Sequence, residues 1–251
     1  MRRSRIYCDS TIQPNQSLLM DERNNHYLLH VLRVKVGQAL IIFDGSGDDF
    51  QSTVEAVTRK SVTVAVSDTI DRSQIAKESP LQTTLAIAIS KGERMDWVMQ
   101  KATELGVSAI QPLITKRVDV KLNQERMNKR AEHWHGVVIG ACEQSGRSIL
   151  PMLHTPLGID QWLDQQTSQP DHLKLVLRAN GESFSDIATA VTLIPTHATV
   201  LIGPEGGLSE AEIAQAEQVG FIASGFGARI LRTETAPIVA LSLLQSQWGD
   251  F

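Results

Sequence analysis

Residues 198–236 read ATVLIGPEGGLSEAEIAQAEQVGFIASGFGARILRTETA and carry the strongest structural signal in the chain. The opening run, 198–202, is short, continuous and partly β-branched, which is typical of a strand buried on both faces of a sheet. A glycine-rich turn at 203–207 ends this run, and Ser209 with Glu212 three residues later predicts a capping box that opens a helix. A strand, a glycine turn and a helix N-terminus in succession form a common small-molecule site in α/β proteins.

The composition of the first turn narrows the class of ligand. The turn lacks the Lys-Ser/Thr pair of a phosphate-binding P-loop and the Gly-x-Gly-x-x-Gly spacing of a dinucleotide site. Glu205 at its centre would repel a phosphate, so a neutral or cationic ligand fits better. A second turn, 225–227, leads to Ile230 and Leu231, which offer an apolar clamp for a flat ring. Either turn alone is better explained as a plain connection from strand to helix, but the two together, with charged residues beside the glycines, predict a ligand pocket.

The last helix is predicted over 236–247. Thr233 or Thr235 can cap it, and Pro237 is tolerated in its first turn. Apolar residues surround much of its circumference, which indicates burial in the core or against a second subunit.

Length and composition set bounds on the rest. The chain has 251 residues, a net charge of -4 and two cysteines, Cys8 and Cys142, which form no disulfide framework. No apolar run approaches the length of a membrane span. The basic N-terminus is not followed by the apolar segment of a signal peptide, so we expect a cytoplasmic protein that is not in a membrane. The histidines are scattered, and His133 and His135 point to different sides of a helix, so no metal site is expected.

The chain is predicted to divide near residue 72 into domains 1–72 and 73–251. The first domain contains β-like runs at 39–43, 49–54 and 61–66, separated by turn signals, which favour a small barrel or sandwich. A short helix is predicted from Tyr27 to Val34. The second domain alternates strands and helices and so predicts an α/β fold, with a mainly parallel sheet covered by helices on both faces. Its predicted buried strands are 84–89, 110–114, 173–177 and 200–202.

Four ordered motifs resemble a known family. GPEGGLSEAEI followed by RILRTETA is similar to the SPOUT superfamily of knotted, S-adenosylmethionine-dependent methyltransferases. Within it, the chain resembles the family that methylates N3 of a uridine in small-subunit (16S) ribosomal RNA. The other matching motifs are HYLLHVLR at 26–33, RMDWVMQKATELG at 94–106 and ACEQSGR at 141–147. The resemblance therefore covers nearly the whole chain.

The resemblance implies features that the residue pattern does not. Pattern alone predicts a plain open sheet, because knots are nearly absent from proteins. The resemblance instead implies a knotted SPOUT-type domain with its last helix drawn through a loop, preceded by a PUA-like β-barrel that grips RNA. It also implies a homodimer with sites at the subunit junction, S-adenosylmethionine as cofactor, and 16S ribosomal RNA in the assembled small subunit as partner.

The implied cofactor site combines both glycine turns with the neighbouring strand ends. Its predicted members are Leu177, Ile202, Gly203, Pro204, Glu205, Gly206, Gly207, Gly225, Phe226, Gly227, Ile230, Leu231, Arg232, Thr235 and Ala236. Phe226 replaces the leucine that is usual in the family, an apolar exchange expected only to reshape the adenine pocket.

Two side chains are predicted to be catalytic. A cation near the uracil oxygens would stabilise the anion that develops as N3 loses its proton, and Arg232 is the first choice. The alternative for Arg232 is a structural pair with Glu234 or a phosphate. Glu205 is the candidate base or neighbour of the sulfonium, with a role at the N-terminus of the Ser209 helix as the alternative. A relayed water could also take the proton.

Basic residues in both domains are predicted to contact RNA. They are Arg2, Arg3, Arg5, Arg33, Lys91, Arg94, Arg117, Lys121 and Arg147. Such contacts would supply salt-sensitive affinity without reading sequence. Arg117-Val118-Asp119 stands where Arg-Ser-Val is usual, which adds a negative charge to this stretch.

Two other functions compete with uridine N3 methylation. The first is a related knotted methyltransferase acting on ribose 2′-hydroxyls or transfer RNA, which the sequence KGERMD at 91–96 disfavours because ribose-modifying relatives carry Asn-x-Gly there. The second is a non-catalytic RNA-binding module, which the intact loops and Arg232 disfavour.

Overall fold

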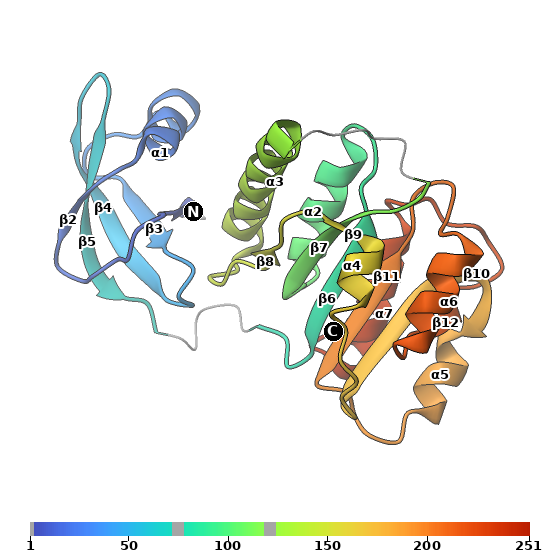
Figure 1. The fold of residues 1–251 in the computed structure, drawn as a ribbon. Coiled ribbons are helices and arrows are strands. Elements are labelled where there is room, and N and C mark those ends of the chain that lie inside the picture. The colour runs from blue at the N-terminus through green and yellow to red at the C-terminus, as the bar shows by residue number, and fades with distance from the viewer. Residues whose placement is uncertain (1–2, 72–77, 118–123) are drawn as a thin grey trace. The chain divides into compact units, whose positions relative to one another are not determined.

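The computed structural model describes residues 3–71, 78–117 and 124–251 (Figure 1). The chain forms two compact units. Unit 1 contains Met1–Glu78 with Ile139–Leu150, and unit 2 contains Ser79–Val138 with Pro151–Phe251. The boundary predicted at residue 72 falls where residues 72–77 lie outside the described chain. The sequence pattern did not predict that 139–150 would belong to the first unit.

Unit 1 is built on a five-stranded sheet of mixed direction. Its strand order is β1 (Arg5–Tyr7), β3 (Ala39–Phe43), β4 (Asp49–Val57), β5 (Val62–Thr69) and β2 (Ser17–Leu19). β1 runs parallel to β3, and the other neighbours are antiparallel. The three β-like runs of the sequence correspond to β3, β4 and β5. Alternate residues such as Val62, Val64 and Val66 enter the core, as the two-residue period of a strand requires.

Two short helical turns close unit 1. Helix α1 (Glu22–His26) continues into the π-helix η1 (Tyr27–Leu32), which takes the place of the helix predicted from Tyr27 to Val34. Arg33 ends the π-helix with left-handed backbone, φ 51°, and the next amide, of Val34, donates to the carbonyl oxygen of Leu28.

Unit 2 is an α/β fold with a seven-stranded parallel sheet. The order is β12 (Ile222–Gly225), β10 (His172–Ser183), β11 (His197–Ile202), β6 (Gln82–Ala88), β7 (Ala109–Ile114) and β8 (Met152–Leu153), with β9 (Leu157–Gly158) also paired to β7. The printed pairings are all parallel. The predicted parallel sheet is therefore confirmed, and β10 extends well beyond its predicted end at residue 177.

Helices cover both faces of this sheet. They are α2 (Arg94–Glu104), α3 (Gln124–Ser145), α4 (Ile159–Leu163), α5 (Phe184–Ala190), α6 (Glu210–Gln218) and α7 (Ala236–Trp248). Gly106, with φ 79°, follows the end of α2, as its position predicted. Helix α3 begins in unit 2 and ends in unit 1.

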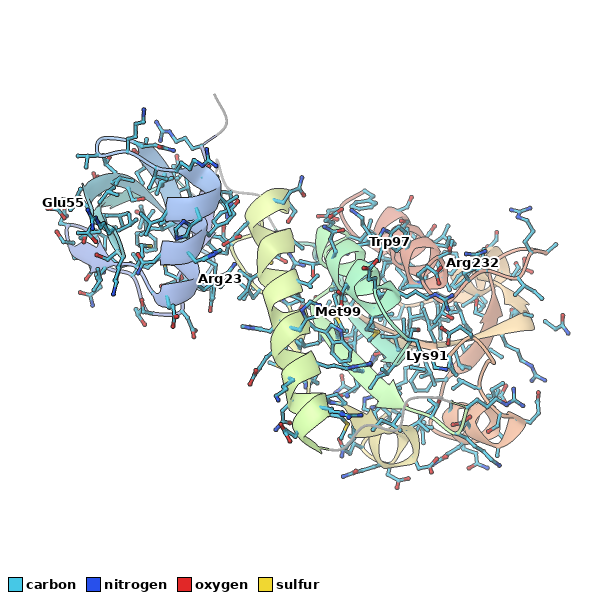
Figure 2. All side chains as sticks on the ribbon, turned by 90° about the horizontal axis from the view of Figure 1, so that it is seen from above. Arg23, Glu55, Lys91, Trp97, Met99 and Arg232 are labelled. Carbon is cyan, nitrogen blue, oxygen red and sulfur yellow. The ribbon has the colours of Figure 1, made fainter. Side chains whose placement is uncertain are left out.

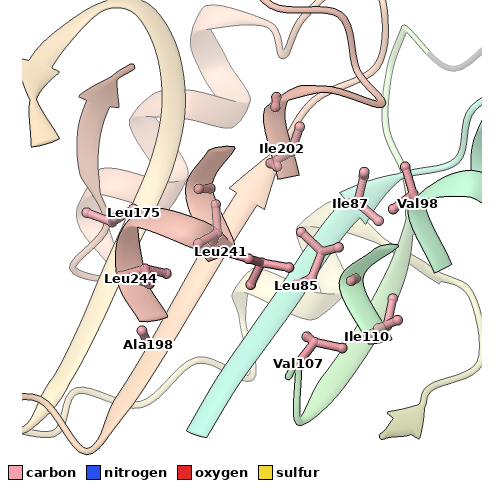
Figure 3. Close-up of a cluster of buried hydrophobic side chains, with 14 of the residues drawn as sticks. Leu85, Ile87, Val98, Val107, Ile110, Leu175, Ala198, Ile202, Leu241 and Leu244 are labelled. Carbon is pink, nitrogen blue, oxygen red and sulfur yellow. The ribbon is translucent and has the colours of Figure 1, made fainter. Parts of the chain in front are cut away.

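Adjacent residues of the central strands enter different hydrophobic clusters. Leu85 and Ile87 pack with α2, α5 and α7, and Figure 3 shows this cluster. Ala86, between them, packs instead with α4 and α6. Both faces of the sheet are therefore buried, which is why the strands read as continuous apolar runs.

The described residues add three further observations. No described helix is long and apolar enough to cross a membrane. No cluster of three or more metal-ligating side chains occurs in the described ranges. Burial raises the pKa of both thiols, Cys8 and Cys142, to about 12, so neither is a thiolate at neutral pH.

Candidate functional site

A cavity of about 740 Å³ lies in unit 2, where several strands of the parallel sheet end. Its walls come from the end of β10, from the turn after β11, from the segment between β12 and α7, and from Arg94 at the start of α2. The carboxyl ends of parallel strands are where α/β sheets bind ligands. The two glycine turns of residues 198–236 thus line one cavity, as predicted.

The first turn is held tight by its glycines. A Cβ on Gly203 would lie 2.7 Å from the backbone nitrogen of Leu208, so no other residue fits without moving the loop. The Gly207 amide donates to the Pro204 carbonyl at 2.7 Å, and Gly207 has φ 70°. The backbone of Gly203, Gly206 and Gly207 therefore lines the cavity without side-chain bulk, whereas Pro204 and Glu205 present side chains.

The predicted capping box fixes the helix that follows this turn. The Ser209 amide donates to Glu212 Oε2 at 2.7 Å, and the Glu212 amide donates to Ser209 Oγ at 3.3 Å. The amide of Lys116 donates to Glu212 Oε1 at 2.8 Å. Burial alone would raise the pKa of the Glu212 carboxyl, but these hydrogen bonds outweigh it and hold the pKa below its usual value.

Arg117 supports the same turn from the segment after β7. Its Nη1 donates to the Gly206 carbonyl at 2.7 Å and to the Leu208 carbonyl at 3.4 Å. A Cβ on Gly206 would meet the stem of Arg117 at 3.6 Å, an ordinary contact. Arg117, predicted as an RNA contact, is therefore placed to shape the first turn.

The second turn supplies most of the apolar lining. Phe226 faces the cavity and packs against the ring of Phe184, with centroids 5.8 Å apart. Leu231 packs against the large cluster of unit 2, whereas Ile230 also lines the cavity but is 90% exposed. The expected clamp thus consists of one anchored side chain and one exposed at the mouth.

All but two of the predicted cofactor residues line this cavity. Gly225 instead packs closely on the backbone of β10, where a Cβ would lie 3.1 Å from the carbonyl oxygen of Gly181. Thr235 occupies the N-cap position of α7, but its side chain makes no capping hydrogen bond, so that expected cap is not formed. Pro237 does lie in the first turn of α7.

Several lining residues were not predicted. Leu208, Arg229, Thr233 and Glu234 belong to the glycine-turn segments already identified, and Ser224 immediately precedes the second turn. Arg178 and Ala179 lie on the part of β10 beyond its predicted end. Arg94 was predicted to contact RNA, but it lines the cavity.

The charged side chains of the cavity differ in whether they form ion pairs or hydrogen bonds. Arg94 Nη1 lies 2.6 Å from Glu205 Oε1, and both side chains are close to half exposed. Arg178 pairs with Glu210 at 2.9 Å. Arg232 is exposed and its guanidinium has no ion pair with the described residues (Figure 2). Glu234 Oε2 is buried and accepts no hydrogen bond from any described residue. The structural Arg232–Glu234 pair considered above is therefore not formed.

The remaining residues predicted to contact RNA differ in their exposure to solvent. Arg3, Arg33 and Lys91 are exposed, whereas Arg2 and Lys121 lie outside the described residues. In unit 1, Arg5 is largely buried and Arg147 is buried, and their guanidinium groups pair with Asp49 and Glu78 respectively. For these last two the phosphate contact stays a prediction, and it would compete with the carboxylate that each guanidinium already neutralises.

Two protein-family models match the chain. A model described as an RNA methyltransferase domain matches residues 77–245. A model described as an RNA methyltransferase PUA domain matches residues 21–67. Between them they cover most of unit 2 and, in unit 1, strands β3 and β4 with most of β5.

Known proteins resemble the chain over nearly its full length. Ribosomal RNA small subunit methyltransferase E of Buchnera aphidicola (from Schizaphis graminum) is 34% identical, covering 98% of this chain and 97% of that protein. The Bacillus subtilis protein of that name is 32% identical, covering 88% and 87%. A Legionella pneumophila structure with bound S-adenosylmethionine is 41% identical with a TM-score of 0.92, and both chains are fully covered. Ribosomal RNA small subunit methyltransferase E of Neisseria gonorrhoeae, bound to S-adenosylmethionine, is 35% identical with a TM-score of 0.88 and full coverage.

Proposed function

The chain belongs to the SPOUT RNA methyltransferase family that includes ribosomal RNA small subunit methyltransferase E, and from this we propose its reaction. It is an S-adenosylmethionine-dependent ribosomal RNA methyltransferase. Its acceptor is N3 of a uridine in the small-subunit RNA, and its substrate is the assembled subunit. The observation that carries this proposal is the single cavity formed by both glycine turns, with Arg232 at its edge.

The cavity suits the chemistry of S-adenosylmethionine. The backbone of residues 203–207 can approach the ligand closely, and Phe226 and Leu231 offer apolar surface for the adenine ring. The carboxylate of Glu205 lines the cavity, where it is paired with Arg94, and it would have to exchange this ion pair to lie beside a sulfonium. The cofactor supplies an activated methyl group, so the protein mainly has to align donor and acceptor. Glu205 is accordingly proposed as a charged neighbour of the cofactor.

Arg232 is proposed as the group that stabilises the transition state. A neutral uracil N3 is a poor nucleophile until its proton is lost, and the negative charge then spreads to the adjacent oxygens. A guanidinium beside those oxygens stabilises that charge most where it is greatest. Arg232 has the required exposure, and no described carboxylate pairs with its guanidinium.

Unit 1 is proposed to add affinity for the ribosomal subunit, and Arg33 tests this. Arg33→Ala should weaken binding of the small subunit and lower the slope of its salt dependence by about one, because one phosphate contact is lost. Cofactor affinity should not change. Filter binding over a range of salt concentrations measures both quantities. Arg59→Ala is the control, because it removes another exposed charge from unit 1. If both variants weaken subunit binding equally, the loss reflects net charge and not a specific contact of Arg33.

We also propose that the methyltransferase domain carries the trefoil knot of its family and forms a homodimer. Helix α7 buries Ala240, Leu241 and Leu244 in the core but leaves Leu243 exposed. Trp97, on the neighbouring helix α2, is 42% exposed. A second copy covering these side chains would remove apolar surface from water.

Sedimentation velocity at micromolar concentration should therefore give a particle of twice the 27.6 kDa chain mass. Changing Trp97 and Leu243 together to glutamate should shift it to the monomer, because burying two charges opposes association. An active wild-type monomer at that concentration would refute the proposed dimer.

The most direct genetic test compares ribosomal RNA from a deletion strain with that of its parent. Loss of 3-methyluridine from 16S RNA alone is expected, as the enzyme acts on ribosomes in the cytoplasm. Loss of a ribose methyl group or of a transfer-RNA modification would favour the related methyltransferases instead. Unchanged nucleosides would favour a non-catalytic RNA-binding module.

A further inference from the structure

The cavity offers few groups that could accept a proton. Its described lining contains no histidine, lysine, tyrosine or cysteine. Its charged members are Glu205 and Glu234, together with Arg94, Arg178, Arg229 and Arg232. If the acceptor is an imide nitrogen, as proposed above, the two glutamates are the side chains suited to take its proton.

The two glutamates are held in different ways. Glu205 receives a 2.6 Å hydrogen bond from Arg94 and lies 44% exposed. Glu234 has an oxygen, Oε2, that is removed from water and accepts no hydrogen bond within the described structure. A buried carboxylate oxygen without a donor is costly, because it has lost its hydrogen bonds to water. Glu234 lines the cavity, and its unpaired oxygen gains a donor when the carboxylate turns toward a bound ligand that carries an N–H.

Glu234 lies close in the chain to a helix N-terminus and to a second functional candidate. It immediately precedes Thr235, the N-cap of the thirteen-residue helix α7, and a helix N-terminus favours negative charge nearby. Two residues earlier in the same segment is Arg232, proposed above to stabilise the uracil anion. On one short segment, Glu234 can therefore accept the N–H proton of an imide while Arg232 binds the adjacent oxygens.

From these observations we propose that Glu234 is the catalytic base of the methyl transfer, an inference that rests on the proposed function. The imide N3 gives its proton to the Glu234 carboxylate, and the N–H electron pair forms the new bond to the methyl carbon. The pair of the methyl–sulfur bond returns to sulfur. The carboxylate, the neutral imide and the sulfonium thus become a carboxylic acid, a methylated imide and a neutral thioether, so charge balances.

Glu234→Gln tests this proposal, because it keeps the size of the side chain and removes the base. The single-turnover rate on small subunits should fall about 100-fold or more. The remaining rate should rise with pH in proportion to hydroxide, since the imide must then ionise unaided. Binding of S-adenosylhomocysteine, measured by calorimetry, should stay within about threefold of wild type. Glu234→Asp should recover part of the rate.

Matched controls make each outcome decisive. Glu217→Gln removes an exposed carboxylate from α6, away from the cavity lining, and should behave as wild type. A Glu234→Gln rate within threefold of wild type would overturn the proposal. So would a loss of S-adenosylhomocysteine affinity that accounts for the whole rate loss, since Glu234 would then be a cofactor contact. Failure of wild type itself to methylate N3 would instead count against the proposed function.

Discussion

Arg232→Ala is expected to lower the rate of methyl transfer about 100-fold while leaving affinity for the small subunit unchanged. This corresponds to about 2.7 kcal/mol of transition-state stabilisation. The reason is that Arg232 lines the cavity, is exposed and has no ion pair within the described residues, so its charge is available to the reacting base. Single-turnover methylation and filter binding measure the two quantities separately.

A conservative variant separates charge from geometry. Arg232→Lys keeps the positive charge but not the planar fork of donors, and it should retain an intermediate rate. Near-normal turnover by Arg232→Ala would remove this residue from catalysis. A parallel loss of subunit affinity would instead identify Arg232 as a phosphate contact, the structural alternative considered from the sequence.

Gly203→Ala is expected to weaken cofactor binding about 100-fold, because displacement of a binding loop by about 1 Å has effects of this size. The added Cβ would lie 2.7 Å from the Leu208 backbone nitrogen and 3.0 Å from the carbonyl carbon of Gly207. Backbone atoms cannot move aside as a flexible side chain can, so the whole first turn must shift. Calorimetry with S-adenosylmethionine measures the affinity.

Gly136→Ala is the matched control for this substitution. Gly136 lies in α3, where an added Cβ meets no atom within 4 Å, and alanine favours a helix. Both variants should melt cooperatively, which separates a local loop shift from unfolding. Unchanged cofactor affinity in a folded Gly203→Ala protein would place the cofactor elsewhere.

Much of the fold could be predicted because its signals are local. The segments that form β3, β6 and β11 are short runs of apolar residues, as buried strands require. The apolar residues of α2 recur at helical spacing. The assignment of 139–150 to unit 1 depends on contacts that no local pattern encodes. Glu143 Oε1, for example, accepts a hydrogen bond from the Tyr7 amide across 136 positions of sequence.

The same distinction applies to the site. Its glycine turns were evident because only glycine permits their close backbone contacts, as at Gly203. The partners of those turns were not evident, because Arg94 meets Glu205 across 111 positions and Arg117 meets Gly206 across 89. Both arginines were therefore interpreted as RNA contacts. The free oxygen of Glu234 likewise emerges only when the surrounding side chains are in place.

The central claim is that this cavity transfers a methyl group to uridine N3 on the small ribosomal subunit. The most direct measurement incubates the purified protein with trideuteromethyl S-adenosylmethionine and small subunits from the deletion strain, followed by mass spectrometry of RNA nucleosides. We expect trideuterated 3-methyluridine in the subunit RNA, and little with a short free oligonucleotide. Label on a ribose, equal labelling of the free oligonucleotide, or no label at all would contradict it.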